Sequence, residues 1–123
     1  MTIFKKFESD IIDLSYLLEA SDNDSDFMLM MIKSFLKNNS AYLDELKVLY
    51  KIEDYSNLYS SVHKYRGSVV IIGIPTLSNL LIEVEQKSLA KQCCSDKLIK
   101  EIEEIGNKAA NELEFFIASE KIE

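Results

Sequence analysis

The sequence contains few of the residues that turn or break a chain. It has three glycines, one proline, one histidine and no tryptophan in 123 residues. A β-rich chain needs a turn about every ten residues, and glycine and proline usually supply it. We therefore expect an all-α protein. A hydrophobic content of 47% is enough to bury one core at this length, and we interpret residues 1–123 as a single domain.

Positive charge is also scarce. The 14 Lys and Arg residues are outnumbered by 21 Asp and Glu residues, which gives a net charge of -7. Such a charge repels phosphate backbones and anionic lipids, so nucleic acid and membrane surfaces are poor candidate partners. No apolar run after Met1 is long enough for a signal peptide or a membrane span. We expect a cytoplasmic protein that acts as a monomer.

The two cysteines, Cys93 and Cys94, are adjacent in the sequence. Neighbours in one helix point about 100° apart, so this pair cannot link two distant elements. No CxxC pattern or Cys/His cluster accompanies them, which argues against a metal site or a redox site. We interpret both as reduced thiols that contribute to helix packing.

Apolar residues recur with helical spacing along most of the chain, and this periodicity predicts five helices. Their approximate ranges are residues 10–20, 25–51, 54–73, 75–94 and 95–120. Gly73 followed by Pro75 is typical of one helix ending and another beginning. The polar run Asn38-Asn39-Ser40 interrupts the second helix, and we interpret it as an exposed patch. We expect an antiparallel up-down four-helix bundle with a short extra N-terminal helix.

The third predicted helix contains four consecutive β-branched residues, Val69 to Ile72. Their helix propensity penalty is only roughly a few tenths of a kcal/mol each, so a strong helical pattern outweighs it. On a helical wheel one side is mainly apolar and collects Leu58, Ser61, Val62, Tyr65, Ser68, Val69 and Ile72. The opposite side collects Ser56, Tyr59, His63, Arg66, Gly67, Val70 and Ile74. The imidazole of His63 is therefore expected to face solvent.

His63 has neighbours that suit the binding of an anion. Arg66, at i+3 on the same face, offers planar hydrogen-bond donors to an anion held on the imidazole. Gly67, at i+4, removes a side chain that would screen this anion from a partner. If the third and fourth helices pair around residue 74, Glu85 lies across from His63. Its carboxylate then either accepts Nδ1–H and leaves Nε2 as the nucleophile, or is an ordinary solvated acid.

The stretch resembles the signature of the histidine-containing phosphotransfer (HPt) domain, a resemblance carried by His63, Arg66, Gly67, Ser68 and Gly73. It spans nearly the whole chain and is most specific over residues 62–86. The fold that it implies is a four-helix bundle with a short extra N-terminal helix. Arg66 stands where lysine is commoner in the family, and the residues after the glycine are bulkier than usual.

The resemblance implies a phosphorelay intermediate in two-component signalling. His63 would accept a phosphoryl group on Nε2 from a receiver-domain phosphoaspartate, or from a sensor or hybrid histidine kinase, and pass it to a response-regulator aspartate. Arg66 would stabilise the phosphate, and Glu85 would orient the imidazole. The protein would be a phosphotransfer protein and not an enzyme, and it would have no ATP site. No glycine-rich nucleotide loop is present in the sequence. It would need no cofactor or metal ion of its own, because the catalytic Mg²⁺ belongs to the receiver domain.

An apolar patch beside the histidine predicts where a receiver docks. We expect the docking surface to contain Tyr59, Lys64, Gly67, Val70 and Ile74. The alternative is a non-catalytic helical adaptor that binds a signalling partner through the same surface. A further alternative is a module of a larger sensor kinase, although Met1 and the complete set of helices favour a free-standing protein.

Overall fold

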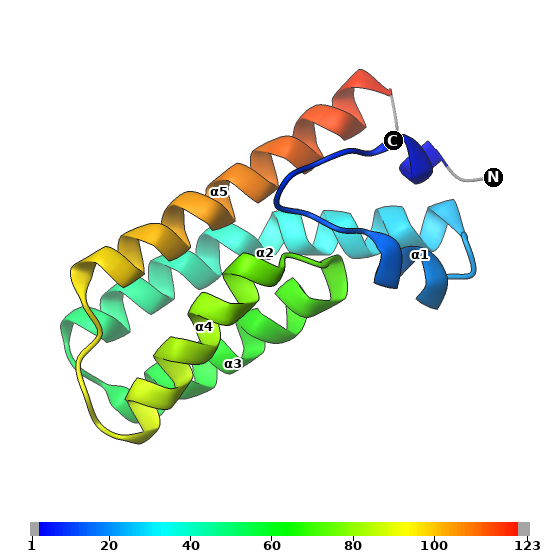
Figure 1. The fold of residues 1–123 in the computed structure, drawn as a ribbon. Coiled ribbons are helices and arrows are strands. Elements are labelled where there is room, and N and C mark those ends of the chain that lie inside the picture. Colours follow the sequence, from blue (N-terminus) through cyan, green and yellow to red (C-terminus); the bar gives the residue numbers. More distant parts are fainter. Residues whose placement is uncertain (1–2, 121–123) are drawn as a thin grey trace.

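The computed structural model describes residues 3–120, and over this range its regular elements are all helices. It contains a short 3-10 helix, η1 (Ile3–Lys6), and five α-helices: α1 (Ser15–Ala20), α2 (Ser25–Lys51), α3 (Tyr55–Ile72), α4 (Pro75–Leu89) and α5 (Asp96–Ser119). The four long helices alternate in direction (Figure 1). Both α3 and α5 pack against α2 and α4. The predicted up-down four-helix bundle with a short N-terminal helix is thus confirmed.

Four helix ends lie at or within one residue of their predicted positions. The carboxylate of Asp24 caps α2 by accepting two backbone N–H groups, and the hydroxyl of Ser95 caps α5 by accepting one. Gly73 ends α3 in the left-handed conformation, with φ 98°. A Cβ atom there would lie 1.9 Å from the carbonyl oxygen of Asp13, so both the backbone and the space require glycine. Pro75 then begins α4.

The first helix, α1, is shorter than predicted, because tertiary and local hydrogen bonds hold the segment before it in another conformation. The Ser9 hydroxyl accepts the backbone N–H groups of Ile11 and Ile12. The N–H of Asp13 donates to the carbonyl of Gly73 at 2.7 Å. The N-terminal segment therefore uses its backbone groups to attach to the α3–α4 turn and not to extend α1.

The fourth helix, α4, also ends earlier than predicted. Lys91 adopts a left-handed conformation, with φ 55°, and this conformation stops the helix although no glycine is present. Cys93 and Cys94 therefore lie in the connection to α5, outside the predicted helix, although Cys94 packs in the core. Both are free thiols; Cys93 is exposed and Cys94 is buried.

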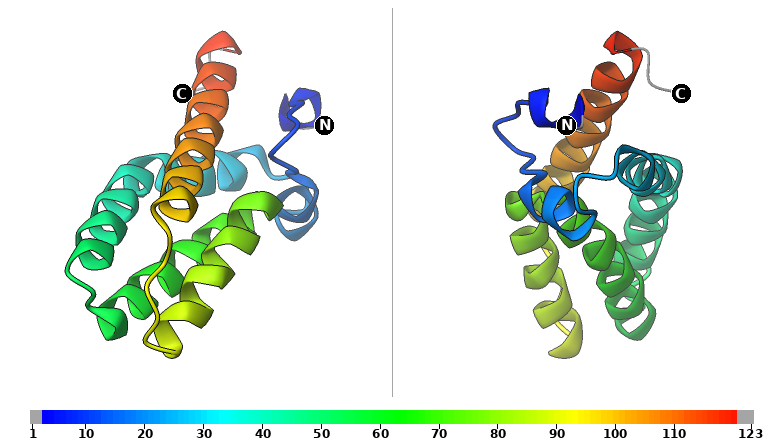
Figure 2. Two further views of the ribbon diagram at one scale, coloured as in Figure 1. Left: turned by 60° about the vertical axis from the view of Figure 1, so that its left-hand side comes forward. Right: turned by 90° about the vertical axis from the view of Figure 1, so that its right-hand side faces the viewer.

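The N-terminal segment lies beside the C-terminal half of α5 (Figure 2). The rings of Phe4 and Phe7 lie 5.8 Å and 5.3 Å from the ring of Phe116. The Ser9 hydroxyl also donates to the carboxylate of Glu112 at 2.5 Å. These contacts close the end of the core that is nearest to the α3–α4 turn. Between residues 3 and 120, no helix combines the length and the apolar character needed to cross a membrane.

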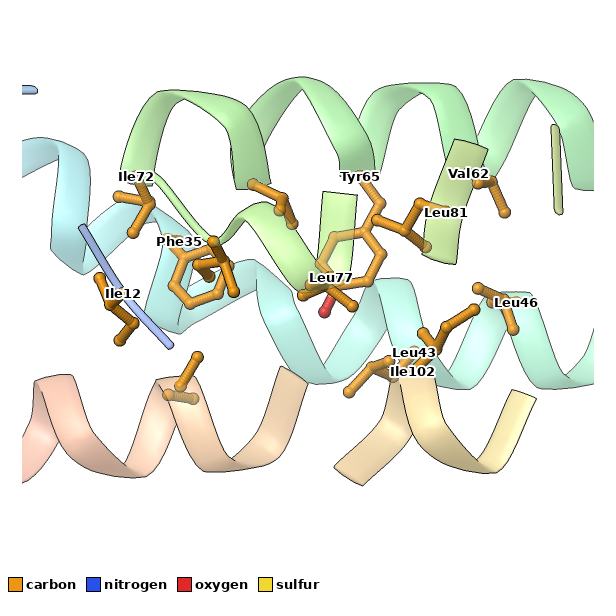
Figure 3. Packing of buried hydrophobic residues seen from close by; sticks show 14 of the residues in the cluster. Ile12, Phe35, Leu43, Leu46, Val62, Tyr65, Ile72, Leu77, Leu81 and Ile102 are labelled. Carbon is orange, nitrogen blue, oxygen red and sulfur yellow. The ribbon is translucent and has the colours of Figure 1, made fainter. Parts of the chain in front are cut away.

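The core lies between the four long helices and continues under the N-terminal segment (Figure 3). Its labelled members are Ile12, Phe35, Leu43, Leu46, Val62, Tyr65, Ile72, Leu77, Leu81 and Ile102. The predicted apolar side of α3 is buried, except that Ser68 is only partly covered. Burial of this stripe outweighs the low helix propensity of its β-branched residues.

Asn39 is buried, and the prediction that the polar run in α2 forms an exposed patch is wrong at this residue. Its side-chain oxygen accepts a hydrogen bond from the Tyr65 hydroxyl at 2.5 Å, and its Nδ2 donates to the carbonyl of Gly106 at 3.3 Å. Gly106 leaves the room for this arrangement, since a Cβ atom there would lie 2.7 Å from the Tyr65 hydroxyl oxygen. The network joins α2, α3 and α5 inside the core.

Candidate functional site

His63 lies in the middle of α3 on the side away from the core. Its side chain is 59% exposed, whereas the adjacent Val62 is fully buried. The ring of Tyr59, one turn earlier, stacks on the imidazole with 5.8 Å between the ring centroids. More than half of the His63 side chain remains exposed beside this stacked ring. The predicted orientation of His63 toward solvent is confirmed.

Gly67 lies one turn after His63 and is exposed. A Cβ atom built on it would meet no atom within 4 Å. Packing in this chain therefore does not require glycine at this position. In a helix interior, glycine normally lowers stability by about 1 kcal/mol relative to alanine. The glycine leaves an open strip of helix surface beside the imidazole.

Arg66 forms an ion pair that its sequence pattern does not predict. Its Nε donates to Oε1 of Glu85 at 2.5 Å, and its Nη2 donates to Oε2 at 3.1 Å. This bidentate hydrogen bonding to the carboxylate raises the pKa of the Arg66 guanidinium. The Glu85 side chain is only 9% exposed, so the alternative that it is an ordinary solvated acid is wrong.

Glu85 lies across from His63, as the hairpin geometry predicts, although the expected hydrogen bond is not formed. The distance from Nδ1 of His63 to Oε1 of Glu85 is 3.6 Å, which is longer than a hydrogen bond. That oxygen instead accepts the shorter bond from Nε of Arg66. The two α3 side chains thus lie around one carboxylate from α4.

The predicted docking residues do not all reach the surface. Lys64 and Gly67 are exposed, Val70 is 47% exposed and Tyr59 is partly buried. Ile74 is only 1% exposed, so its assignment to a docking surface is wrong. The residue lies beyond the end of α3, where the chain turns and directs the side chain into the core.

A shallow hollow of about 260 Å³ begins at Val70 and continues over the first turn of α4. It is lined by Val70, Gly73, Ile74, Pro75, Ser78 and Asn79. Gly73 and Pro75 shape it because the turn that they form brings α4 back alongside α3. Within residues 3–120, no three or more His, Cys, Asp or Glu side chains are grouped so that they can hold a metal ion.

The fold and the site define a class of protein: a helical bundle with a single imidazole exposed on its outer surface. Comparison with protein families identifies that class. The model of the Hpt domain matches residues 30–111, which include α3 and α4 completely. The chain belongs to the Hpt domain family. Membership implies histidine phosphotransfer within a phosphorelay, as an intermediate and not as a kinase domain.

Among solved structures, the chain is similar to the crystal structure of the HPT domain from an Hpt sensor hybrid histidine kinase of Shewanella. The TM-score is 0.77 at 18% sequence identity, over 88% of this chain and 94% of the other. This likeness supports the fold. No curated protein matches the chain.

Proposed function

We propose that His63 is the phosphoryl carrier of this Hpt protein. The observation that carries the proposal is the placement of the chain's single histidine on the exposed side of α3, beside the open surface at Gly67. Nε2 attacks the phosphorus of a receiver phosphoaspartate, so that the N–P bond forms while the P–O bond to the aspartate breaks and releases its carboxylate. A second receiver aspartate later attacks the same phosphorus and restores the imidazole.

The charged neighbours support this chemistry. Arg66 uses two of its N–H groups on Glu85, and a guanidinium has five. The remaining donors stabilise the charge on the phosphoryl oxygens during transfer. The Glu85 carboxylate lies on the Nδ1 side of the ring, where its charge favours the tautomer with a proton on Nδ1 and a free electron pair on Nε2. Lys64 adds a positive charge that attracts the acidic pocket of a receiver.

The proposed partner is a response-regulator receiver domain, with a sensor or hybrid histidine kinase as a second source of the phosphoryl group. The receiver docks over Tyr59, Lys64, Gly67 and Val70 and extends toward the hollow beside Val70. A Mg²⁺ ion bound by the receiver would neutralise its aspartate pocket. The protein contributes the nucleophile and the guanidinium and no cofactor of its own.

Incubation with a phosphorylated receiver domain and Mg²⁺ tests the proposal. The expected result is acid-labile, base-stable phosphate on this chain and its loss in His63→Gln, with circular dichroism to show that the variant keeps its helices. Label that persists in His63→Gln would contradict the assignment. A receiver that binds the wild type and the variant equally, without labelling either, would instead favour the helical adaptor.

A further inference from the structure

Glu85 is a buried carboxylate with two basic side chains around it. Its Oε1 accepts from Nε of Arg66 at 2.5 Å and lies 3.6 Å from Nδ1 of His63. The side chains are 9% exposed for Glu85, 27% for Arg66 and 59% for His63. Exposure thus rises from the carboxylate to the imidazole.

The charge of Glu85 has opposite consequences for two steps of the transfer. An unpaired carboxylate at this distance attracts a proton to the imidazole, and an imidazolium has no free electron pair at Nε2. The same carboxylate also repels an incoming phosphoryl group, which carries close to two negative charges. Both effects are reduced when a cation is bound to the carboxylate.

We propose that Arg66 masks the charge of Glu85 beside the imidazole, and that Glu85 acts as a positioning residue for the guanidinium of Arg66. Glu85 in turn fixes the guanidinium, because bidentate pairing selects one orientation of its plane. The donors not used by Glu85 are then held beside His63 before any phosphate arrives. This role deepens the proposed function and rests on it only where phosphate is concerned.

The electrostatic surroundings of the imidazole are simple enough to test. Glu85 from α4 lies 3.6 Å from Nδ1, Tyr59 from α3 stacks on the ring, and Lys64 and Arg66 are near it along α3. Tyr65 lies on the buried side of α3, away from the imidazole, and its hydroxyl donates to Asn39 in the core. Substitutions at Arg66 and Glu85 therefore change the charge beside the ring directly.

The experiment is a double-substitution cycle on the unphosphorylated protein, followed by NMR titration of the His63 ring protons. In Arg66→Ala the midpoint of this titration moves to higher pH by about one unit, because the carboxylate is unmasked. In Glu85→Gln it moves to lower pH, because the arginine is left without its anion. In the double variant it returns close to the wild-type midpoint. Arg66→Lys keeps the charge and leaves the midpoint nearly unchanged.

A second measurement uses phosphoramidate, a small phosphoryl donor that needs no receiver. Arg66→Ala reduces the rate of His63 phosphorylation at neutral pH by roughly threefold, because a one-unit shift from the ordinary imidazole value lowers the fraction of neutral imidazole from about three quarters to about one quarter. The double variant regains part of this rate. Arg66→Lys remains slower than the wild type, because lysine has no planar pair of donors.

Two outcomes would overturn the inference: a titration midpoint that does not move to higher pH in Arg66→Ala, or a double variant that differs from the wild type as much as Arg66→Ala does. Circular dichroism of each variant separates these outcomes from loss of the fold. Failure of the receiver to phosphorylate His63 would remove the proposed function and leave the titration result standing, so the two failures are distinguishable.

Discussion

Replacement of Gly67 by alanine is expected to stabilise the protein and to impair its transfer reaction. The position is exposed and lies within α3, and a Cβ atom there meets nothing within 4 Å. Alanine is favoured over glycine by about 1 kcal/mol in a helix interior, because it restricts the unfolded chain and its methyl group causes no strain here.

The size of the stabilisation follows from the length of the chain. An unfolding entropy of about 2.1 cal/mol/K per residue over 123 residues gives about 0.26 kcal/mol/K. A gain of about 1 kcal/mol therefore raises Tm by about 4 °C, which thermal unfolding followed by circular dichroism resolves easily. The matched control is Gly106→Ala, which should lower Tm because its methyl group would lie 2.7 Å from the Tyr65 hydroxyl oxygen.

The functional effect should depend on the size of the phosphoryl donor. The new methyl group lies one turn from His63 and separates the surface of α3 from a docked receiver, so transfer from the receiver is expected to fall roughly tenfold or more. Phosphorylation by phosphoramidate should stay within about twofold of the wild type, because a small donor needs no contact at Gly67. Lower stability, or unchanged transfer from the receiver, would refute the reasoning.

Three further substitutions test the surface and the core. Val70→Glu should weaken receiver binding roughly tenfold in a calorimetric titration. The control Val48→Glu on α2, which replaces a side chain that is 59% exposed, should leave receiver binding unchanged. A large loss of helicity in Val70→Glu would show that Val70 is core. Asn39→Ala should cost about 2–3 kcal/mol in urea unfolding, since it leaves the buried Tyr65 hydroxyl without its acceptor, and a cost near zero would mean that the hydroxyl finds another. Ser61→Ala should be neutral or stabilising by about 1 kcal/mol, because the buried Ser61 hydroxyl has no partner among residues 3–120; a clear loss of stability would indicate a partner.

Periodicity and turn chemistry predicted the bundle because both are local properties of the chain. Gly73 and Pro75 marked the hairpin correctly, since a left-handed glycine and a helix-starting proline leave few alternatives. The two helix ends that were predicted incorrectly, the start of α1 and the end of α4, have causes other than periodicity and turn chemistry. The start of α1 is determined by the bond from Asp13 to Gly73, and the end of α4 by a left-handed Lys91.

The burial of Asn39 could not be predicted from the residues near it in the sequence. Its two hydrogen-bond partners, Tyr65 and Gly106, lie 26 and 67 residues away in the sequence. A polar residue within an apolar stripe is equally consistent with an exposed interruption and with an internal network, and only the assembled bundle distinguishes them.

The site was predicted as far as the helical hairpin determines it. Pairing of α3 and α4 around residue 74 predicts that Glu85 lies across from His63, because a tight turn fixes the register of two antiparallel helices. The Arg66–Glu85 pair depends on the direction taken by a long, flexible side chain, which a helical wheel does not specify. The helical wheel does not hold for Ile74, because α3 ends at Ile72 and the rotation of about 100° per residue no longer applies beyond it.

All groups assigned to the site, from Tyr59 to Glu85, lie on two helices joined by one tight turn. Their relative positions are therefore determined by contacts between residues close in sequence, which form early and with little loss of chain entropy. The helices α2 and α5 supply apolar support without contributing a side chain to the site. Insertions between α1 and α2, or after the C-terminal end of α5, should consequently leave the hairpin of α3 and α4 intact. Those positions are therefore suitable for attaching a fluorescent reporter or a second domain.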